Sequence, residues 1–119
     1  MIIGVQGTTN FFDYSVFLSG MGAALYRMND NDKVFTVFSA GPYNLNAMAQ
    51  EFINVSNFKG RGIKAKLVKV PPNWFKDNFD IIDRFAFFAN EKEQPSSIAR
   101  FLDTKDIDVQ VYRYHQLVK

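Results

Sequence analysis

The sequence predicts a single α/β domain of the doubly wound, Rossmann-like class, with a mainly parallel five-stranded sheet in the order 3-2-1-4-5 and helices on both faces. Strand-like and helix-like segments alternate along the chain. The central strand-like segments, such as residues 34–39 (VFTVFS), are almost wholly apolar, which is typical of strands covered on both faces. Right-handed crossovers between parallel strands then favour this strand order.

The composition indicates a globular chain with its own core. A chain of 119 residues that is 47% hydrophobic is expected to form one domain, residues 1–119, and its 13 phenylalanines indicate an aromatic core. The absence of cysteine excludes disulfides, thiol catalysis and cysteine zinc sites. The chain lacks an apolar run of the ~18 residues that a membrane span needs and lacks a signal peptide. We therefore expect a cytoplasmic protein without membrane contact.

The first half of the chain reads as strand, helix, strand, helix. Strands are predicted over residues 2–6 and 34–39. A helix is predicted over residues 14–28, with Asp13 as its cap and four apolar residues at helical spacing on one face: Phe17, Met21, Leu25 and Met28. A second helix is predicted over residues 45–58, with Asn44 as its cap and four inward-facing residues: Leu45, Met48, Phe52 and Val55.

The second half supplies three further strands. Residues 64–70 are predicted as a strand whose lysines 64, 66 and 69 suit a sheet edge, where charge discourages strand addition. Two prolines end it, and residues 75–82 form a short weak helix or an ordered loop. Residues 84–88 (RFAFF) are the fourth strand, followed by a polar loop over residues 89–94. A helix over residues 95–103 and a strand over residues 109–114 complete the pattern.

Ligands of doubly wound sheets bind beyond the carboxyl ends of the strands, where the strand order reverses. Here that point falls between the first and fourth strands, so the relevant loops span residues 7–10, 39–46, 71–75 and 89–97. The candidate ligand-binding residues in these loops are Gly7, Thr8, Thr9, Asn10, Ser39, Gly41, Tyr43, Asn44, Trp74 and Ser96. No catalytic residue, metal ligand or cofactor is expected.

Each loop has a functional and a structural interpretation. In the first, Gly7 allows close approach of an anion, with donors at Thr8, Thr9 and Asn10 and a helix N-terminus downstream. The alternative is a plain turn with Asn10 or Asp13 capping the helix. In the second, Gly41 gives backbone access, Asn44 tolerates a left-handed conformation, and Tyr43 either stacks on a base or packs on a neighbouring loop. In the third, Trp74 walls a pocket or closes the core.

These loops resemble those of the SLOG superfamily, the Rossmann-like group that includes the DNA-processing protein DprA and the lysine-decarboxylase-like (LOG) phosphoribohydrolases. The small single-domain members carry G-S-R after strand 1, S-G-G-A-x-G-x-D after strand 2 and P-x-x-W after strand 3. This chain has Gly7-Thr8-Thr9, then Ser39-Ala40-Gly41-Pro42-Tyr43-Asn44-Leu45-Asn46, then Pro71-Pro72-Asn73-Trp74. The order and spacing of the segments carry the resemblance, which implies a nucleotide-binding shell.

The departures from that family bear on activity. The basic residue of the first loop is absent, and Ala40, Asn44 and Asn46 replace two glycines and an aspartate. LOG enzymes carry P-G-G-x-G-T-x-x-E after the fourth strand, whereas this chain has FFANEKEQPSS. The catalytic glutamate is therefore not carried over to Glu91 or Glu93. An enzymatic alternative, glycosidic cleavage of a nucleotide, would need a carboxylate near the ribose, with three candidates: Asp77, Asp80 and Glu91.

Other features have simpler interpretations. The lone His115 is expected at the surface, and the aspartates at 30, 32, 103, 106 and 108 lack the spacing of a calcium loop. The basic run over residues 59–69 suits a loop and an edge strand, so nucleic acid binding is unlikely. Mid-helix glycines in SGMGAA, residues 19–24, pack on the sheet or on a second subunit, because each costs ~1 kcal/mol against alanine.

Two functions are expected from this reading. The first is a non-catalytic binding module for a nucleotide or nucleotide-derived ligand. The alternative is a protein-interaction module that keeps the fold, has lost the site, and forms a homo-oligomer or binds a protein partner. The phenylalanine-rich and asparagine-rich composition would suit a phage-encoded accessory protein in the host cytoplasm.

Overall fold

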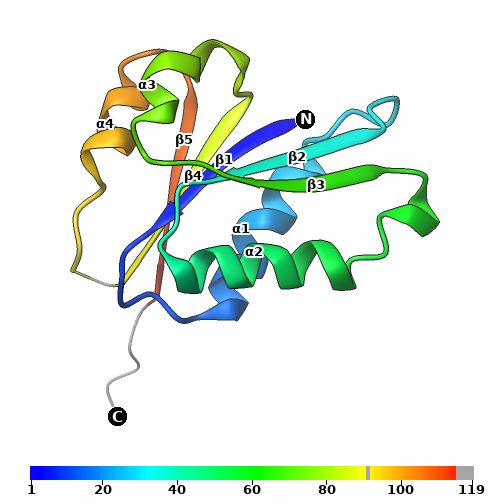
Figure 1. Ribbon diagram of the computed structural model, residues 1–119, viewed down its shortest axis with the longest axis horizontal. Coiled ribbons are helices and arrows are strands. Elements are labelled where there is room, and N and C mark those ends of the chain that lie inside the picture. Colours follow the sequence, from blue (N-terminus) through cyan, green and yellow to red (C-terminus); the bar gives the residue numbers. More distant parts are fainter. Residues whose placement is uncertain (91, 115–119) are drawn as a thin grey trace.

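The computed structural model describes residues 1–90 and 92–114 and confirms the predicted fold class. Its five strands are all parallel and lie in the order β3-β2-β1-β4-β5 (Figure 1). The strands are β1 (Ile2–Gly7), β2 (Val34–Ser39), β3 (Lys64–Lys69), β4 (Arg84–Asn90) and β5 (Asp108–Tyr114). The helices are α1 (Tyr14–Tyr26), α2 (Tyr43–Val55), α3 (Trp74–Asn78) and α4 (Ser97–Asp103), with 3₁₀ turns η1 (Lys59–Arg61) and η2 (Phe79–Ile81).

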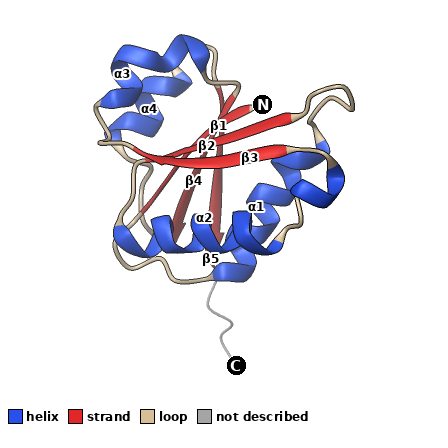
Figure 2. Cartoon of the chain, turned by 45° about the vertical axis from the view of Figure 1, so that its right-hand side comes forward, coloured by secondary structure: helices blue, strands red, loops and turns tan. Residues whose placement is uncertain are grey.

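The helices form two layers, one on each face of the sheet. Helices α1 and α2 cover one face and α3 and α4 the other (Figure 2). Under α1 and α2 the core is aromatic: the Phe17 ring lies 5.0 Å from Phe88 and 6.2 Å from Phe52, centroid to centroid. On the opposite face Phe75 meets Phe85 edge-on at 5.1 Å. The predicted aromatic core is therefore confirmed on both sides of the sheet.

Helix α1 begins where the sequence predicts and ends two residues early. The Asp13 carboxylate accepts a hydrogen bond from the Val16 N–H at 3.0 Å, which confirms the predicted cap. At the other end the Arg27 N–H bonds to Ala24 and the Met28 N–H to Leu25, so the last turn tightens into the 3₁₀ pattern.

The predicted limits of the second helix are wrong at both ends. Helix α2 starts at Tyr43 after Pro42, so Asn44 lies inside the first turn and is not the cap. It ends at Val55, because Asn57 adopts a left-handed φ of 52° that no helix continues through. Val55, predicted to face inward, is 60% exposed.

The remaining boundaries follow from strand pairing. Strand β4 runs on to Asn90, two residues beyond the prediction, because Ala89 and Asn90 pair with β5. The segment predicted as a short weak helix is divided between α3 and η2. Strand β3 is an edge strand with exposed lysines, as predicted. No helix within residues 1–90 and 92–114 is long and apolar enough to cross a membrane.

Candidate functional site

The carboxyl ends of the parallel strands all reach the same edge of the sheet. The loops after β1, β2 and β4 therefore meet at that edge, at the reversal of strand order between β1 and β4. Backbone and side-chain hydrogen bonds join them. The Gly7 N–H donates to the Gly41 oxygen at 3.0 Å, the Thr8 N–H to the Phe88 oxygen at 3.0 Å, and the Asn90 side-chain nitrogen to the Asn10 oxygen at 3.0 Å.

Two backbone N–H groups at the start of the first loop donate to other parts of the protein. The N–H groups of Gly7 and Thr8 are both hydrogen-bonded internally, so neither is available to a ligand in this structure. A Cβ on Gly7 would meet Leu45 at 3.2 Å and the Phe88 oxygen at 3.3 Å, so close packing accounts for the glycine. Six residues separate Gly7 from α1, whose N-terminus Asp13 already caps. These contacts favour the turn interpretation of this loop, with Thr9 exposed beside it.

The Glu93 carboxylate links the loop after β1 to the loop after β4. With its amide nitrogen turned toward Glu93, Asn10 donates to the Glu93 carboxylate at 2.7 Å and to the Thr8 hydroxyl at 3.0 Å. The Asn90 N–H donates to the same carboxylate at 3.2 Å. Glu93 is therefore a structural anion that joins two loops, a role sequence reasoning missed. The Arg113 guanidinium donates to the backbone oxygens of Asn90 and Glu93. Glu91 lies outside the described residues.

Ser96 holds the start of α4. Its hydroxyl accepts from the Ala99 N–H at 3.1 Å and donates to the Gln6 side-chain oxygen at 2.6 Å. It is thus the N-cap of α4 and a link to β1 at once. Both hydrogen-bonding roles of this hydroxyl are filled by the protein.

The second loop leaves a helix end open. Ser39 is fully buried and its hydroxyl donates to the Asn46 side-chain oxygen. Gly41 has a φ of +82°, which allows the chain to turn into α2. The helix then begins after Pro42, and no side chain caps it. Within residues 1–90 and 92–114, the first-turn N–H groups at Tyr43, Asn44 and Leu45 therefore have no side-chain cap.

Two exposed aromatic side chains flank this helix end. Tyr43 is 86% exposed and Phe12 is 72% exposed. The Asn44 amide donates to the backbone oxygen of Phe11, which ties the loop carrying Phe12 to the first turn of α2. Sequence reasoning missed Phe12. The sequence feature that could have revealed it is the pair Phe11-Phe12, because two adjacent loop residues rarely both point into the core. Phe11 is buried, and Phe12 is exposed.

Trp74 faces the core rather than the loops around α2. Its ring stacks on Phe38 at 4.4 Å with an interplanar angle of 23° and meets Phe75 edge-on at 5.3 Å. It packs, half-buried, with the residues under α3 and α4. This position supports the packing interpretation of Trp74.

The remaining candidates for catalysis or metal binding are acidic side chains and one histidine. Within residues 1–90 and 92–114 no group of three histidine, aspartate or glutamate side chains could hold a metal ion. Asp77 and Asp80 are exposed on α3 and η2. His115 lies outside the described residues. The pKa of Tyr14, at the start of α1, is raised by burial and by the nearby charge of Glu51.

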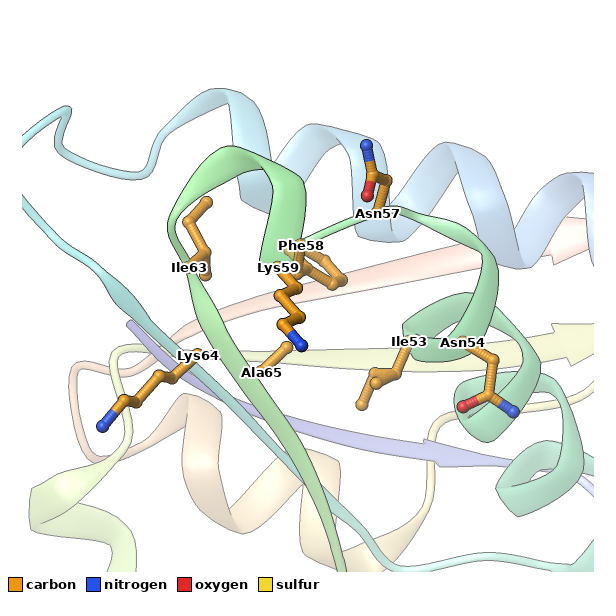
Figure 3. A pocket seen from close by; sticks show the side chains of 8 residues that line it. All are labelled: Ile53, Asn54, Asn57, Phe58, Lys59, Ile63, Lys64 and Ala65. Atoms are coloured by element: carbon orange, nitrogen blue, oxygen red, sulfur yellow. The ribbon is translucent and has the colours of Figure 1, made fainter.

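A pocket of about 570 Å³ lies elsewhere, between the C-terminal end of α2, η1 and the start of β3 (Figure 3). None of the predicted ligand-binding residues lines it. The fold is thus a doubly wound α/β domain of the Rossmann-like class with loops joined at its switch point. Comparison with protein-family models, curated proteins and solved structures finds no match to this chain. The resemblance to the SLOG superfamily stays a prediction.

Proposed function

We propose that the chain is a non-catalytic binding module for a nucleotide-type ligand whose phosphate meets the N-terminus of α2. The observation that carries this proposal is the first turn of α2, which has no side-chain cap among the described residues, so its N–H groups and the positive end of the helix dipole favour an anion. This differs from a cradle made by Gly7 and Thr8, whose N–H groups are already bonded.

The surroundings of this helix end fit the rest of a nucleotide. Tyr43 and Phe12 present exposed aromatic rings on segments that the Asn44 bond holds together, and a base stacks favourably on such rings. Glu93 follows β4 and accepts from Asn10 and Asn90. We assign the phosphate to the first turn of α2, because the polar groups at Asn10 are already bonded to Glu93.

The test is a titration of the purified chain with a panel of nucleotides, including cyclic and ADP-ribose types, monitored by thermal shift. Binding by AMP but not by adenosine would show that the phosphate is required. Tyr43→Glu should abolish binding, because it places a negative charge in the first turn of α2 that repels the phosphate. The same charge is favourable to the helix dipole, so the helix should stay folded. Tyr43→Phe should retain it. Tyr26→Glu, at an equally exposed tyrosine on α1, is the matched control. An unchanged melting temperature across the panel would refute the proposal.

A second candidate, self-association through α1, is favoured by the outer face of that helix. Leu18 and Tyr26 are exposed, Gly22 between them has no atom within 4 Å of an added Cβ, and the helix carries no charged residue. Gly20 instead packs on the sheet: its Cβ would lie 2.8 Å from Phe88. Sedimentation of wild type and Gly22→Leu tests this candidate. A monomer at all concentrations would exclude it.

A further inference from the structure

The pocket at the far end of α2 has an apolar floor and a lysine directed into it, and the Arg61 guanidinium lies 6.0 Å from the centroid of the Phe58 ring. Ile53, Phe58, Ile63 and Ala65 supply the floor. Figure 3 shows the Lys59 side chain pointing into the pocket, whereas the Lys64 ammonium points away from it. A volume of about 570 Å³ falls within the range of small-molecule sites, roughly 300–1,000 Å³.

The walls of this pocket are held in place by the fold. The Phe58 ring is buried and stacks on Phe35 at 5.5 Å. The Ile63 N–H donates to the Phe58 oxygen at 2.9 Å, which closes the η1 turn over the start of β3. Gly62, with a φ of +72°, makes that closure possible. The pocket is therefore formed before any ligand arrives.

The sequence segment that supplies most of the pocket lining is rich in basic residues. Residues 52–76 contain no aspartate or glutamate and six basic residues: Lys59, Arg61, Lys64, Lys66, Lys69 and Lys76. The rest of the chain holds the other eight basic residues and all 12 acidic ones. Among the residues that the structure describes, none of these six side chains forms an ion pair. Of the six, Lys59 and Lys64 line the pocket, whereas Lys76 lies on α3, which covers the other face of the sheet.

The C-terminal end of α2 lies beside the pocket, and a helix C-terminus presents partly negative carbonyl groups. One of these groups, the Phe52 oxygen, accepts from the Ser56 N–H at 3.2 Å and from the Ser56 hydroxyl at 2.6 Å. The Lys59 ammonium supplies the positive charge at the pocket itself.

We propose that this pocket binds a small organic anion with an aromatic or branched aliphatic body, such as an aromatic carboxylate. The body rests on the apolar floor, and the carboxylate accepts a charge-assisted hydrogen bond from the Lys59 ammonium. This site is separate from the nucleotide site proposed above and does not depend on it, because the two lie at opposite ends of α2.

The test uses 1-naphthoate and its uncharged counterpart 1-naphthamide as probes of the whole chain. Methyl NMR signals of Ile53, Ile63 and Ala65 report on the pocket, and Ile82, buried on the other face of the sheet, serves as the reference. Naphthoate should shift the three pocket signals saturably and leave Ile82 unmoved. It should bind about tenfold more tightly than naphthamide, as one charge-assisted hydrogen bond implies.

Two lysine variants separate a site from a general charge effect. Lys59→Met keeps the length of the side chain and removes the ammonium, so the preference for naphthoate should disappear. Lys64→Met should keep it, since that ammonium points away from the pocket. An unshifted Ile82 signal in each free variant shows that the fold is intact. Equal binding of both probes by wild type, no saturable shift, or an unchanged preference in Lys59→Met would overturn the proposal.

Discussion

The backbone N–H of Gly7 donates to the carbonyl oxygen of Gly41 at 3.0 Å, so the loops that follow β1 and β2 form one hydrogen-bonded unit. A sequence motif centred on either glycine describes half of this unit. The bond also decides which groups remain for a ligand. The Gly7 N–H is hydrogen-bonded to the protein, whereas the first turn of α2, which follows Gly41, has no side-chain cap among the described residues.

The two glycines of α1 should respond oppositely to alanine. A Cβ on Gly20 would lie 2.8 Å from the Phe88 ring and 3.0 Å from Tyr112, so Gly20→Ala should lower the free energy of unfolding by roughly 2 kcal/mol. Gly22 has open space around it, so Gly22→Ala should raise it by about 0.5–1 kcal/mol. Urea denaturation measures both. Equal effects would mean that α1 does not pack on the sheet through Gly20.

Tyr14→Phe should stabilise the protein. The Tyr14 hydroxyl oxygen is buried, and no group in the described part of the chain hydrogen-bonds to it. Removing it should raise the free energy of unfolding by about 1 kcal/mol. Because burial raises the pKa of Tyr14, the wild type should lose further stability above about pH 10 as the pH rises through that pKa. Tyr26→Phe, at a 92% exposed tyrosine, should leave the free energy of unfolding at neutral pH unchanged.

Asp108→Asn should destabilise the protein at neutral pH and make little difference in acid. The buried Arg84 guanidinium is paired with the Asp108 carboxylate, so losing that charge should cost roughly 2 kcal/mol. The hydrogen bond from Gln110 and the charge of Arg84 lower the pKa of Asp108. The stabilisation is therefore present above the usual aspartate pKa of about 3.9 and is lost as the pH falls through the folded value.

Denaturation of wild type and Asp108→Asn between pH 2 and pH 7 measures this dependence. The gap between the two proteins should close in the acid range. A gap that stayed constant down to pH 2 would show that the carboxylate charge is not what holds Arg84.

Ser96→Ala should cost about 1 kcal/mol, because it removes the cap of α4. It also removes the hydrogen bond to Gln6 of β1. Ser97→Ala tests the neighbouring, exposed hydroxyl and should lie within about 0.5 kcal/mol of wild type. Thermal unfolding of the two variants under identical conditions provides the comparison. A loss shared by both would argue against a capping role specific to Ser96.

The strand pattern was predictable because each strand is covered on both faces or lies at an edge. A covered strand gives an apolar run in the sequence, and an edge strand gives charged residues at its exposed positions. Residues 34–39 are almost wholly apolar, and lysines 64, 66 and 69 lie on the exposed positions of β3. The helix limits were less predictable. The cap predicted at Asn44 was wrong because the backbone conformation at Gly41 and Pro42 starts the helix earlier, which no side-chain pattern reports.

The candidate site shows the same division. The sequence placed the loops at the switch point, because strand order follows from alternation and handedness. It did not show that Ser39, Ser96 and Asn10 use their polar groups within the protein, since their partners Asn46, Gln6 and Glu93 were not assigned to them beforehand. Hydrogen-bond partners distant in sequence are visible only in the folded chain.

By itself the sequence determined the α/β class, the strand order, the Asp13 cap and the aromatic character of the core. These follow from local periodicity and composition, which act over a few residues at a time. Only the tertiary structure decided that the first turn of α2 has no side-chain cap among the described residues, that Trp74 stacks on Phe38, and that Lys59 points into a pocket. Those features depend on how residues far apart in the chain pack together, and packing competes with any ligand for the same polar groups.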